Sequence, residues 1–410
     1  MLKTHHLDLN HPDFIANPYP TMQELRDHLP VFYDEPWKKV FFTRYEDIAA
    51  LLRDKRLGRS ILHVMSREEL GWPPPDPRRM GFDRFQSNVF MDWEPPDHTR
   101  IRTLVAKVFT AQRVEGLRGK LEATVHRLID GVESQPHADF VRDIAEPLPV
   151  AMIADLLGVP EEDRHRLRPW SAAIVRMYEL GYTDEQMDAA STAAREFMDY
   201  MGRLAAQRRA HPQDDLVTDL VHVQDQGHGL SEDELRATCI FLLNAGHEAS
   251  VNGSALGLLA LLRNPAQLEL LRQAAAAPDG APLFKTAVEE MLRYDSPLPM
   301  FERWVLEDMD YKGISLKRGM EVALLYASGN RDPRRFERAD ELDLTRKDNA
   351  HLTFGLGTHY CMGAPLARLE LQILFKALLQ RLPTLRLATG RVEFDKGFVI
   401  RGLKRLPIAL

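Results

Sequence analysis

Cysteine is scarce in this chain of 410 residues, which contains only Cys239 and Cys361. Two cysteines cannot form a disulfide framework, so we expect a reducing, cytoplasmic setting. The first residues contain no apolar run, so we expect neither a signal peptide nor a membrane anchor. The glycine-rich loops that bind dinucleotides or phosphates are also absent, which argues against a flavin or nicotinamide site. A net charge of −7 argues against nucleic acid as the main partner.

The remaining composition is that of an ordinary globular protein, 44% hydrophobic and 28% charged. Apolar periodicity predicts helices over 114–133, 147–157, 161–177, 183–209 and 215–223. The longest predicted helix covers 231–263, from a Ser231–Glu234 capping box to Pro265. Within it, Cys239 is most simply a packed core residue. Alternating, turn-rich stretches near both ends predict short strands, and the proline-rich residues 61–92 predict an irregular loop.

The stretch around the second cysteine, His351 to Arg368, reads H-L-T-F-G-L-G-T-H-Y-C-M-G-A-P-L-A-R. Its glycines permit a tight loop, and the apolar stripe after Ala364 predicts a helix. Cys361 would then precede a helix start, where the macrodipole favours a thiolate. A thiolate there can serve as a nucleophile, a metal ligand or a haem ligand. His359 is the one nearby base or further ligand, whereas a structural zinc site needs about four ligands.

The segment F-G-L-G-T-H-Y-C-M-G resembles the haem-binding signature of the cytochrome P450 superfamily, Phe-x-x-Gly-x-[His/Arg]-x-Cys-x-Gly. The matching residues are Phe354, Gly357, His359, Cys361 and Gly363. The resemblance implies a mainly α-helical fold with a smaller β-rich part, a triangular prism with a long central helix, as one domain over residues 1–410. It also implies haem b (iron protoporphyrin IX) with Cys361 as the axial ligand and Phe354 and Gly363 beside the cofactor. Thiolate ligation favours O–O cleavage.

A second segment, W-E-P-P-D-H-T-R-I-R, is similar to the superfamily's propionate-binding helix start. His98 and Arg102 lie four residues apart, on one helical face. The resemblance implies that both bind haem propionates, together with Arg303 and His359, because partly buried carboxylates need cationic donors. A solvated basic face is the other interpretation of His98 and Arg102.

In the longest predicted helix, A-G-H-E-A-S at 245–250 resembles the superfamily's oxygen-activating motif, [Ala/Gly]-Gly-x-[Asp/Glu]-Thr-[Thr/Ser]. The chain departs from it at Ala249, where the usual threonine hydroxyl helps to deliver protons to dioxygen. Ser250 is turned away by about 100°, so we do not transfer that role to it. Glu248 matches the acidic position and is the candidate proton relay. We hypothesise that a substrate hydroxyl or an ordered water replaces the missing hydroxyl.

Further residues are predicted to line the substrate pocket. One face of the long helix, by resemblance the haem-facing one, carries Phe241, Asn244, Ala245 and Ala249. Loops that resemble substrate-contact segments add Leu298, Val399 and Ile400. We expect the Asn244 amide to meet a polar substrate atom or, alternatively, to bond the local backbone.

A fourth motif, E-x-x-R at Glu290 and Arg293, places two opposite charges three residues apart on a helix. With Arg346 it resembles the superfamily's structural triad, which is not catalytic. The triad is expected to support the cysteine-loop side of the core.

The implied reaction is oxidation, usually hydroxylation, of a small and largely apolar organic substrate by O2. Electrons would come from a ferredoxin or flavodoxin with its reductase, and we expect a monomer. Candidates for a basic docking patch are Arg100, Lys107, Arg113, Arg334 and Arg335. The alternative interpretation, of equal weight, is that these are scattered solvated charges. Two alternatives remain: a peroxide-using or atypical haem-thiolate oxidase, and a non-catalytic haem sensor or carrier. The superfamily's peroxide users typically carry Arg-Pro where this chain has Glu248-Ala249.

Overall fold

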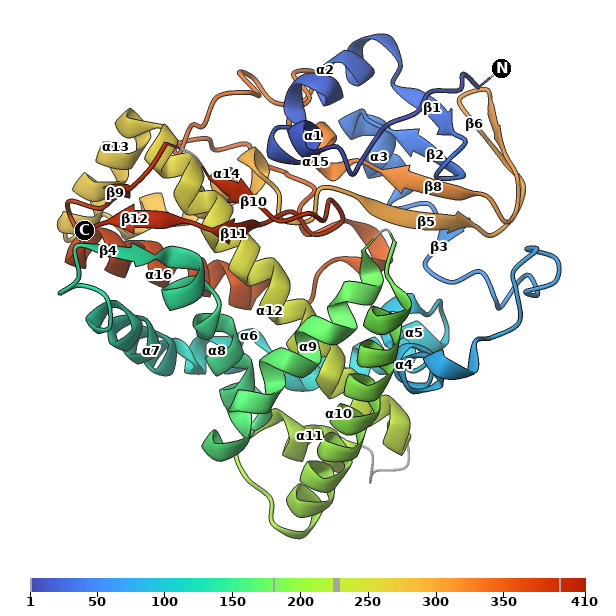
Figure 1. Ribbon diagram of the computed structural model, residues 1–410, viewed down its shortest axis with the longest axis horizontal. Helices are drawn as coiled ribbons and strands as arrows, with labels where there is room; N and C mark the ends of the chain where they lie inside the picture. Colours follow the sequence, from blue (N-terminus) through green and yellow to red (C-terminus); the bar gives the residue numbers. More distant parts are fainter. Residues whose placement is uncertain (1, 180, 224–228, 391) are drawn as a thin grey trace. The chain divides into compact units, whose positions relative to one another are not determined.

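A computed structural model describes residues 2–179, 181–223, 229–390 and 392–410 (Figure 1). Its internal contacts divide the chain into two compact units. The first unit comprises Met1–Ile61, Leu121–Pro147 and Ala249–Leu410, and the second comprises Leu62–Lys120 and Leu148–Glu248. That the whole of 1–410 behaves as one domain stays a prediction.

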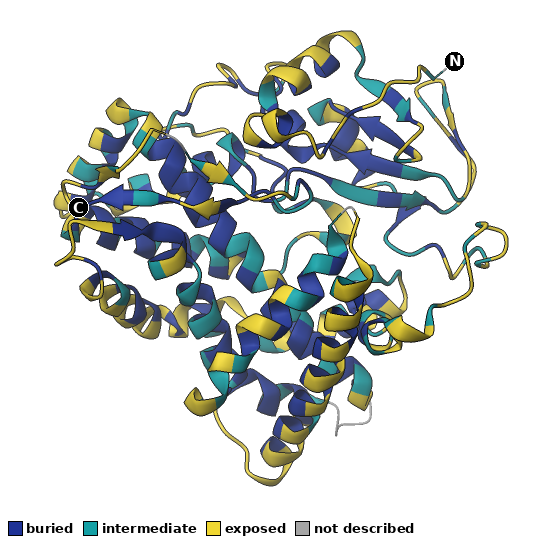
Figure 2. Cartoon of the chain, in the orientation of Figure 1, coloured by how far each residue is buried: buried dark blue, intermediate teal, exposed yellow. Residues whose placement is uncertain are grey.

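The described β-strands lie in the first unit. The largest sheet has the order β1-β2-β8-β5-β3, formed by Val31–Asp34, Lys39–Phe42, Glu321–Leu324, Phe301–Val305 and Leu57–Gly58. Strands β2 and β8 pair in parallel, so an N-terminal hairpin lies beside strands from the last third of the chain (Figure 1). All four residues of β2 are buried (Figure 2), which fits its continuous apolar run V-F-F.

Three smaller sheets complete the β-rich part. They are β6–β7 (Met309–Tyr311, Ile314–Leu316), β4-β12-β9 (His137–Asp139, Pro407–Ala409, Arg386–Leu387) and β10–β11 (Glu393–Phe394, Leu403–Arg405). The helices mainly in the first unit are α1 (Pro12–Ala16), α2 (Tyr19–His28), α3 (Tyr45–Leu51), α7 (Arg118–Asp130), α13 (Pro265–Ala276), α14 (Ala281–Tyr294), α15 (Tyr326–Asn330) and α16 (Ala364–Arg381). Helix α14 packs on both α13 and α16.

The second unit is helical. Its helices are α4 (Met80–Gln86), α5 (Asp97–Val108), α6 (Ala111–Gly116), α8 (Pro147–Leu157), α9 (Leu167–Val175), α10 (Asp184–Ala210) and α11 (Leu216–Val223). Three expectations were wrong in detail. The single helix over 161–177 is divided, because two 3-10 helices, Glu161–Arg166 and Arg176–Tyr178, lie on either side of α9. The irregular loop over 61–92 contains α4, which buries Phe82 and Phe85 at helical spacing. The single helix over 114–133 is broken near Leu117 into α6 and α7.

Helix α12 (Glu232–Arg263) is 32 residues long and runs through the boundary between the units. It begins as predicted: Ser231 N–H donates to Glu234 Oε2 at 2.7 Å, and Glu234 N–H donates to Ser231 Oγ at 3.2 Å. Cys239 is fully buried in it, as expected of a core residue. In the part of the chain that the structure describes, no helix has the length and apolarity needed to cross a membrane.

Candidate functional site

The cysteine loop is a tight turn directly before α16. Cys361 is half-buried, and its N–H donates to the Phe354 carbonyl at 2.9 Å. Gly355 (φ 67°) and Gly357 (φ 71°) adopt the left-handed backbone conformation that favours glycine. A side chain at Gly357 would also meet the Leu52 carbonyl at 2.5 Å. The loop therefore holds the thiol just before the free N–H groups of a helix, as the sequence predicts.

The Glu290 carboxylate lies at the centre of a buried polar cluster in the first unit. Arg293 Nε donates to Glu290 Oε2 at 2.8 Å, and Arg346 Nε donates to the same oxygen at 3.0 Å. Further donors to this carboxylate are the Asp343 N–H and the Asn349 amide. The structure thus brings together the three residues of the expected triad, although they come from α14 and from a loop more than fifty residues later.

The preceding residue, Glu289, belongs to a network that the sequence analysis missed. Its carboxylate accepts two hydrogen bonds from Arg368 on α16, at 2.7 and 2.8 Å. His351 Nε2 lies 3.2 Å from Glu289 Oε2. Consecutive helix residues point about 100° apart, so the carboxylates of Glu289 and Glu290 bind two separate sets of cationic side chains.

The four predicted propionate donors are divided between the units. In the second unit, His98 is buried on α5 and Arg102 is half-buried one turn later. In the first unit, Arg303 is buried on β5 and His359 ends a short 3-10 turn. Their convergence on one ligand stays a prediction.

An aromatic contact links His98 to the long helix within the second unit. The ring of Phe90 lies 6.2 Å from that of His98 and 5.2 Å, edge-on, from that of Phe241. The α5 and α12 segments of the predicted site are therefore neighbours.

The middle of α12 carries an accessible strip. Ala245 is exposed and Phe241 and Ala249 are half-buried, whereas Ile240 and Leu243 are fully buried. Spacings of four residues place the strip along one face. The face about 100° away is closed, because a side chain at Gly246 would meet Ile153 of α8 at 2.9 Å. A flat group can lie against small side chains on such a strip, which fits a haem.

Two polar side chains flank this strip. Asn244 is 4% exposed, and neither amide atom has a hydrogen-bond partner among the residues that the structure describes. The alternative in which the amide bonds local backbone is therefore not observed. One turn later, Glu248 Oε1 lies 3.4 Å from Nδ1 of the buried His247, and the Glu248 side chain is partly open to solvent. The Glu248 carboxylate is thus accessible to bulk water.

The structure also brings the predicted substrate-contact loops of the first unit together. Leu298, Val399 and Ile400 are all half-buried. Arg401, next to Ile400, donates to the Asp295 carboxylate at 2.8 Å, and its N–H donates to the Pro297 carbonyl at 2.9 Å. Arg401 therefore attaches one loop to the other.

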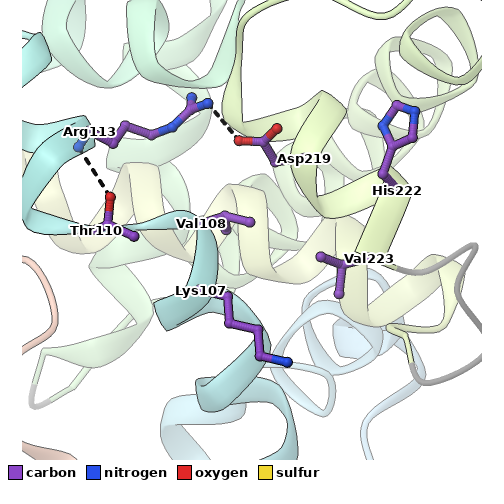
Figure 3. A pocket seen from close by; sticks show the side chains of 7 residues that line it. All are labelled: Lys107, Val108, Thr110, Arg113, Asp219, His222 and Val223. Carbon is purple, nitrogen blue, oxygen red and sulfur yellow. Dashed lines mark hydrogen bonds and ion pairs between the residues drawn. The ribbon is translucent and has the colours of Figure 1, made fainter.

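The predicted basic docking patch is largely neutralised by carboxylates. Arg100 donates to Glu234 at 2.6 Å and Arg113 to Asp219 at 2.6 Å. In the first unit, the ion pairs are Arg334–Asp27 and Arg335–Asp348. Of the five predicted residues, Lys107 alone forms no ion pair within the described ranges. With Arg113, Thr110, Asp219 and His222 it lines a surface pocket of about 380 Å³ (Figure 3).

Comparisons with known proteins show which family the chain resembles. The family model "Cytochrome P450" matches residues 173–392. The polyketide biosynthesis cytochrome P450 PksS of Bacillus subtilis (strain 168) is 38% identical, with 97% of each chain covered. The biotin biosynthesis cytochrome P450 of the same strain is 36% identical, again with 97% covered. A crystal structure of P450BioI with a hexadec-9Z-enoic acid-ligated acyl carrier protein has a TM-score of 0.89 at 35% identity, covering 97% of this chain and 99% of that one.

The chain therefore belongs to the cytochrome P450 family, and the predicted fold class is confirmed. It is an oxidoreductase that binds haem b and incorporates oxygen from O2 into its substrate, with electrons supplied by a redox partner. The donor set described above, a thiol on a tight loop and buried cationic side chains, fits this cofactor.

Proposed function

We propose that the enzyme hydroxylates a long acyl or polyketide chain that carries a hydrogen-bonding oxygen near the carbon to be oxidised. The observation that carries this proposal is the buried Asn244 amide, which has no partner in the described structure. A buried amide without a hydrogen bond costs about 1–3 kcal/mol, so a substrate oxygen that pairs with it gains selectivity. The names of the relatives support the chain-like substrate, since they include a polyketide enzyme and a complex with a fatty acyl group.

The same substrate oxygen, or a water held by it, replaces the threonine hydroxyl that is absent at Ala249. Asn244 and Glu248 are four residues apart and hence neighbours on one side of α12. An oxygen bound by Asn244 therefore lies on the side from which Glu248 delivers protons. When bound, haem b with Cys361 as its axial ligand supplies dioxygen activation and O–O cleavage. One oxygen atom enters a C–H bond and the other leaves as water, which consumes two electrons and two protons.

The test restores the hydroxyl. In Ala249→Thr, product formed per electron consumed should fall for a chain with an in-chain hydroxyl, because the new side chain competes for the relay position. It should rise for hexadecenoic acid, which lacks that oxygen. Ser250→Ala is the matched control and should change neither ratio. A clear rise with the hydroxylated chain contradicts the proposal.

The electron donor is a ferredoxin or flavodoxin, and its acidic surface is attracted by Lys107, which alone of the five predicted docking residues forms no ion pair in the described ranges. Lys107→Glu should slow reduction by such a donor, with a smaller difference at high salt because screening weakens exposed charge interactions. Arg335→Glu, which alters an already paired charge, is the control. Equal rates for both variants contradict this docking site.

A further inference from the structure

Arg368 contacts two residues of the cysteine loop, Phe354 and Tyr360, which both precede the cysteine. Its guanidinium lies over the Phe354 ring, 4.5 Å from the ring centre, and Nη1 donates to the Tyr360 hydroxyl at 3.2 Å. Tyr360 immediately precedes Cys361, and the Phe354 carbonyl accepts the hydrogen bond from the Cys361 N–H. One planar side chain therefore touches both residues that position the cysteine.

Glu289 and His351 fix the position of that guanidinium. The two parallel hydrogen bonds from Arg368 to Glu289 define both the plane and the direction of the guanidinium. Burial alone would raise the pKa of Glu289, but the hydrogen bonds from Arg368 and His351 outweigh it and lower the pKa to about 2. The carboxylate is therefore charged at neutral pH.

His351 completes the network from the other end of the loop. Its Nδ1 accepts the Thr353 N–H at 3.2 Å, and on the other side of the ring Nε2 lies 3.2 Å from Glu289 Oε2. The His351 ring also lies 5.6 Å from the Phe354 ring, in a tilted contact. The Thr353 hydroxyl donates to the Leu292 carbonyl of α14 at 2.8 Å, which attaches this end of the loop to the same helix.

We propose that Arg368, Glu289 and His351 form a positioning network that holds Phe354 and Tyr360, and through them fixes the bond between Cys361 and haem. The inference rests on the assignment of Cys361 as the axial ligand. The network is distinct from the Glu290 cluster, although α14 supplies a carboxylate to each. Arg368 and Glu289 carry opposite charges, so the network orients the loop without adding net charge. Groups that orient a metal ligand typically contribute about 10- to 100-fold in metal affinity.

The experiment compares Arg368→Lys and Arg368→Gln with the native haem-loaded enzyme. Haem transfer to apomyoglobin and the absorbance of the ferrous carbon monoxide complex report the cysteine–haem bond independently of turnover. Both variants should lose haem about 10-fold faster. In both variants, the absorbance of the ferrous carbon monoxide complex should also shift. It should move from the band after which cytochrome P450 is named towards the band of haem that has lost its bond to the thiolate. Lysine keeps the positive charge but lacks the planar, bidentate geometry of arginine, so Arg368→Lys should not restore haem retention.

Arg381→Gln is the control, because Arg381 is on the same helix but pairs with Asp130, away from the loop. Tyr360→Phe removes a single hydroxyl and tests the same network if an Arg368 variant fails to fold. It should show a smaller increase in haem loss and a smaller shift of the absorbance band. Native haem retention in both Arg368 variants, or full rescue by lysine, overturns the proposal. Cys361→Ser distinguishes failure of the positioning network from failure of the ligand assignment. If the thiolate band survives in this variant, the assignment of Cys361 as the axial ligand is wrong.

Discussion

Helices α14 and α12 both place polar side chains in buried positions, but they satisfy them differently. On α14, Glu290 is fully buried and receives hydrogen bonds from two arginines, an amide and a backbone N–H. On α12, the Asn244 amide is nearly as buried and has no partner in the described structure. Buried polar groups are normally paired, so an exception calls for an explanation.

The difference separates a region whose buried polar groups are paired within the protein from one that we propose is completed by a ligand. Substitution at a satisfied cluster should cost stability, because it leaves buried charges behind. Substitution of an unpaired amide by an apolar side chain should stabilise the protein and weaken substrate binding. The following variants test this contrast, beginning with the largest expected effect.

Glu290→Gln removes the charge that compensates Arg293 and Arg346. We expect a loss of about 3–5 kcal/mol in the free energy of unfolding, because two buried guanidinium groups lose their counter-ion. Urea titration of the haem-loaded protein measures it. Glu269→Gln, at an exposed position 4.0 Å from Arg272, is the control and should change stability by less than about 0.5 kcal/mol. Equal losses of stability in the two variants would contradict the special role of the buried Glu290 carboxylate.

Glu289→Gln should lower stability in a pH-dependent way. Because the folded-state pKa of Glu289 is about 2, below its ordinary value of 4.5, its contribution is fully present above pH 4.5 and is lost as the pH falls towards 2. We expect the variant to be less stable by about 2–3 kcal/mol at pH 7. The difference should narrow across that acid range when unfolding is followed at several pH values. A gap that stays constant argues against a charged carboxylate.

Glu370→Gln should have the opposite effect on stability to Glu289→Gln. Glu370 is buried on α16, and burial raises its pKa to about 8. For a raised carboxyl pKa, stability falls as the pH rises from 4.5 towards 8, because the unfolded chain ionises more readily. The variant should therefore be more stable at pH 7 by about 2 kcal/mol. The stability difference between the variant and the native protein should disappear near pH 4. A variant that is less stable than the native protein at pH 7 contradicts a raised pKa of Glu370.

Asn244→Leu tests the unpaired amide directly. We expect stability to rise by about 1 kcal/mol, because a buried group without a partner is replaced by an apolar one of similar size. Spectral titration should show roughly 10-fold weaker binding of an oxygen-bearing chain, equal to one lost hydrogen bond, and little change for hexadecenoic acid. Asn264→Leu is the matched control, since that amide bonds the Ala260 carbonyl at 2.8 Å and its loss should destabilise.

The elements with strong local signals could be predicted from the sequence. Helix α8 has the predicted bounds, and α12 begins at the predicted capping box. Helix α4 was missed, because four prolines precede it and its apolar spacing extends over only two turns. Local propensity carries less information when a helix is short and is stabilised mainly by packing, here against α10.

The candidate site was predictable only as far as its motifs extend. The cysteine loop and the Glu290 cluster follow from spacing in a recognisable pattern. The Arg368–Glu289 contact joins residues 79 positions apart, and no periodicity relates them. The unpaired state of Asn244 was equally inaccessible, because it depends on what surrounds the amide in the folded second unit. Such contacts are set by tertiary packing and require coordinates.

The anchoring of Arg401 has a practical consequence for redesign. Besides Asp295, it binds the backbone carbonyls of Ile15 and Ala16, and the next residue, Gly402, packs so closely that a side chain there would overlap Asn252. The course of the backbone is thereby fixed by contacts of Arg401 and Gly402, the two residues that follow Ile400. Positions 399 and 400 can accordingly be randomised in a directed-evolution library while the scaffold beneath them keeps its shape.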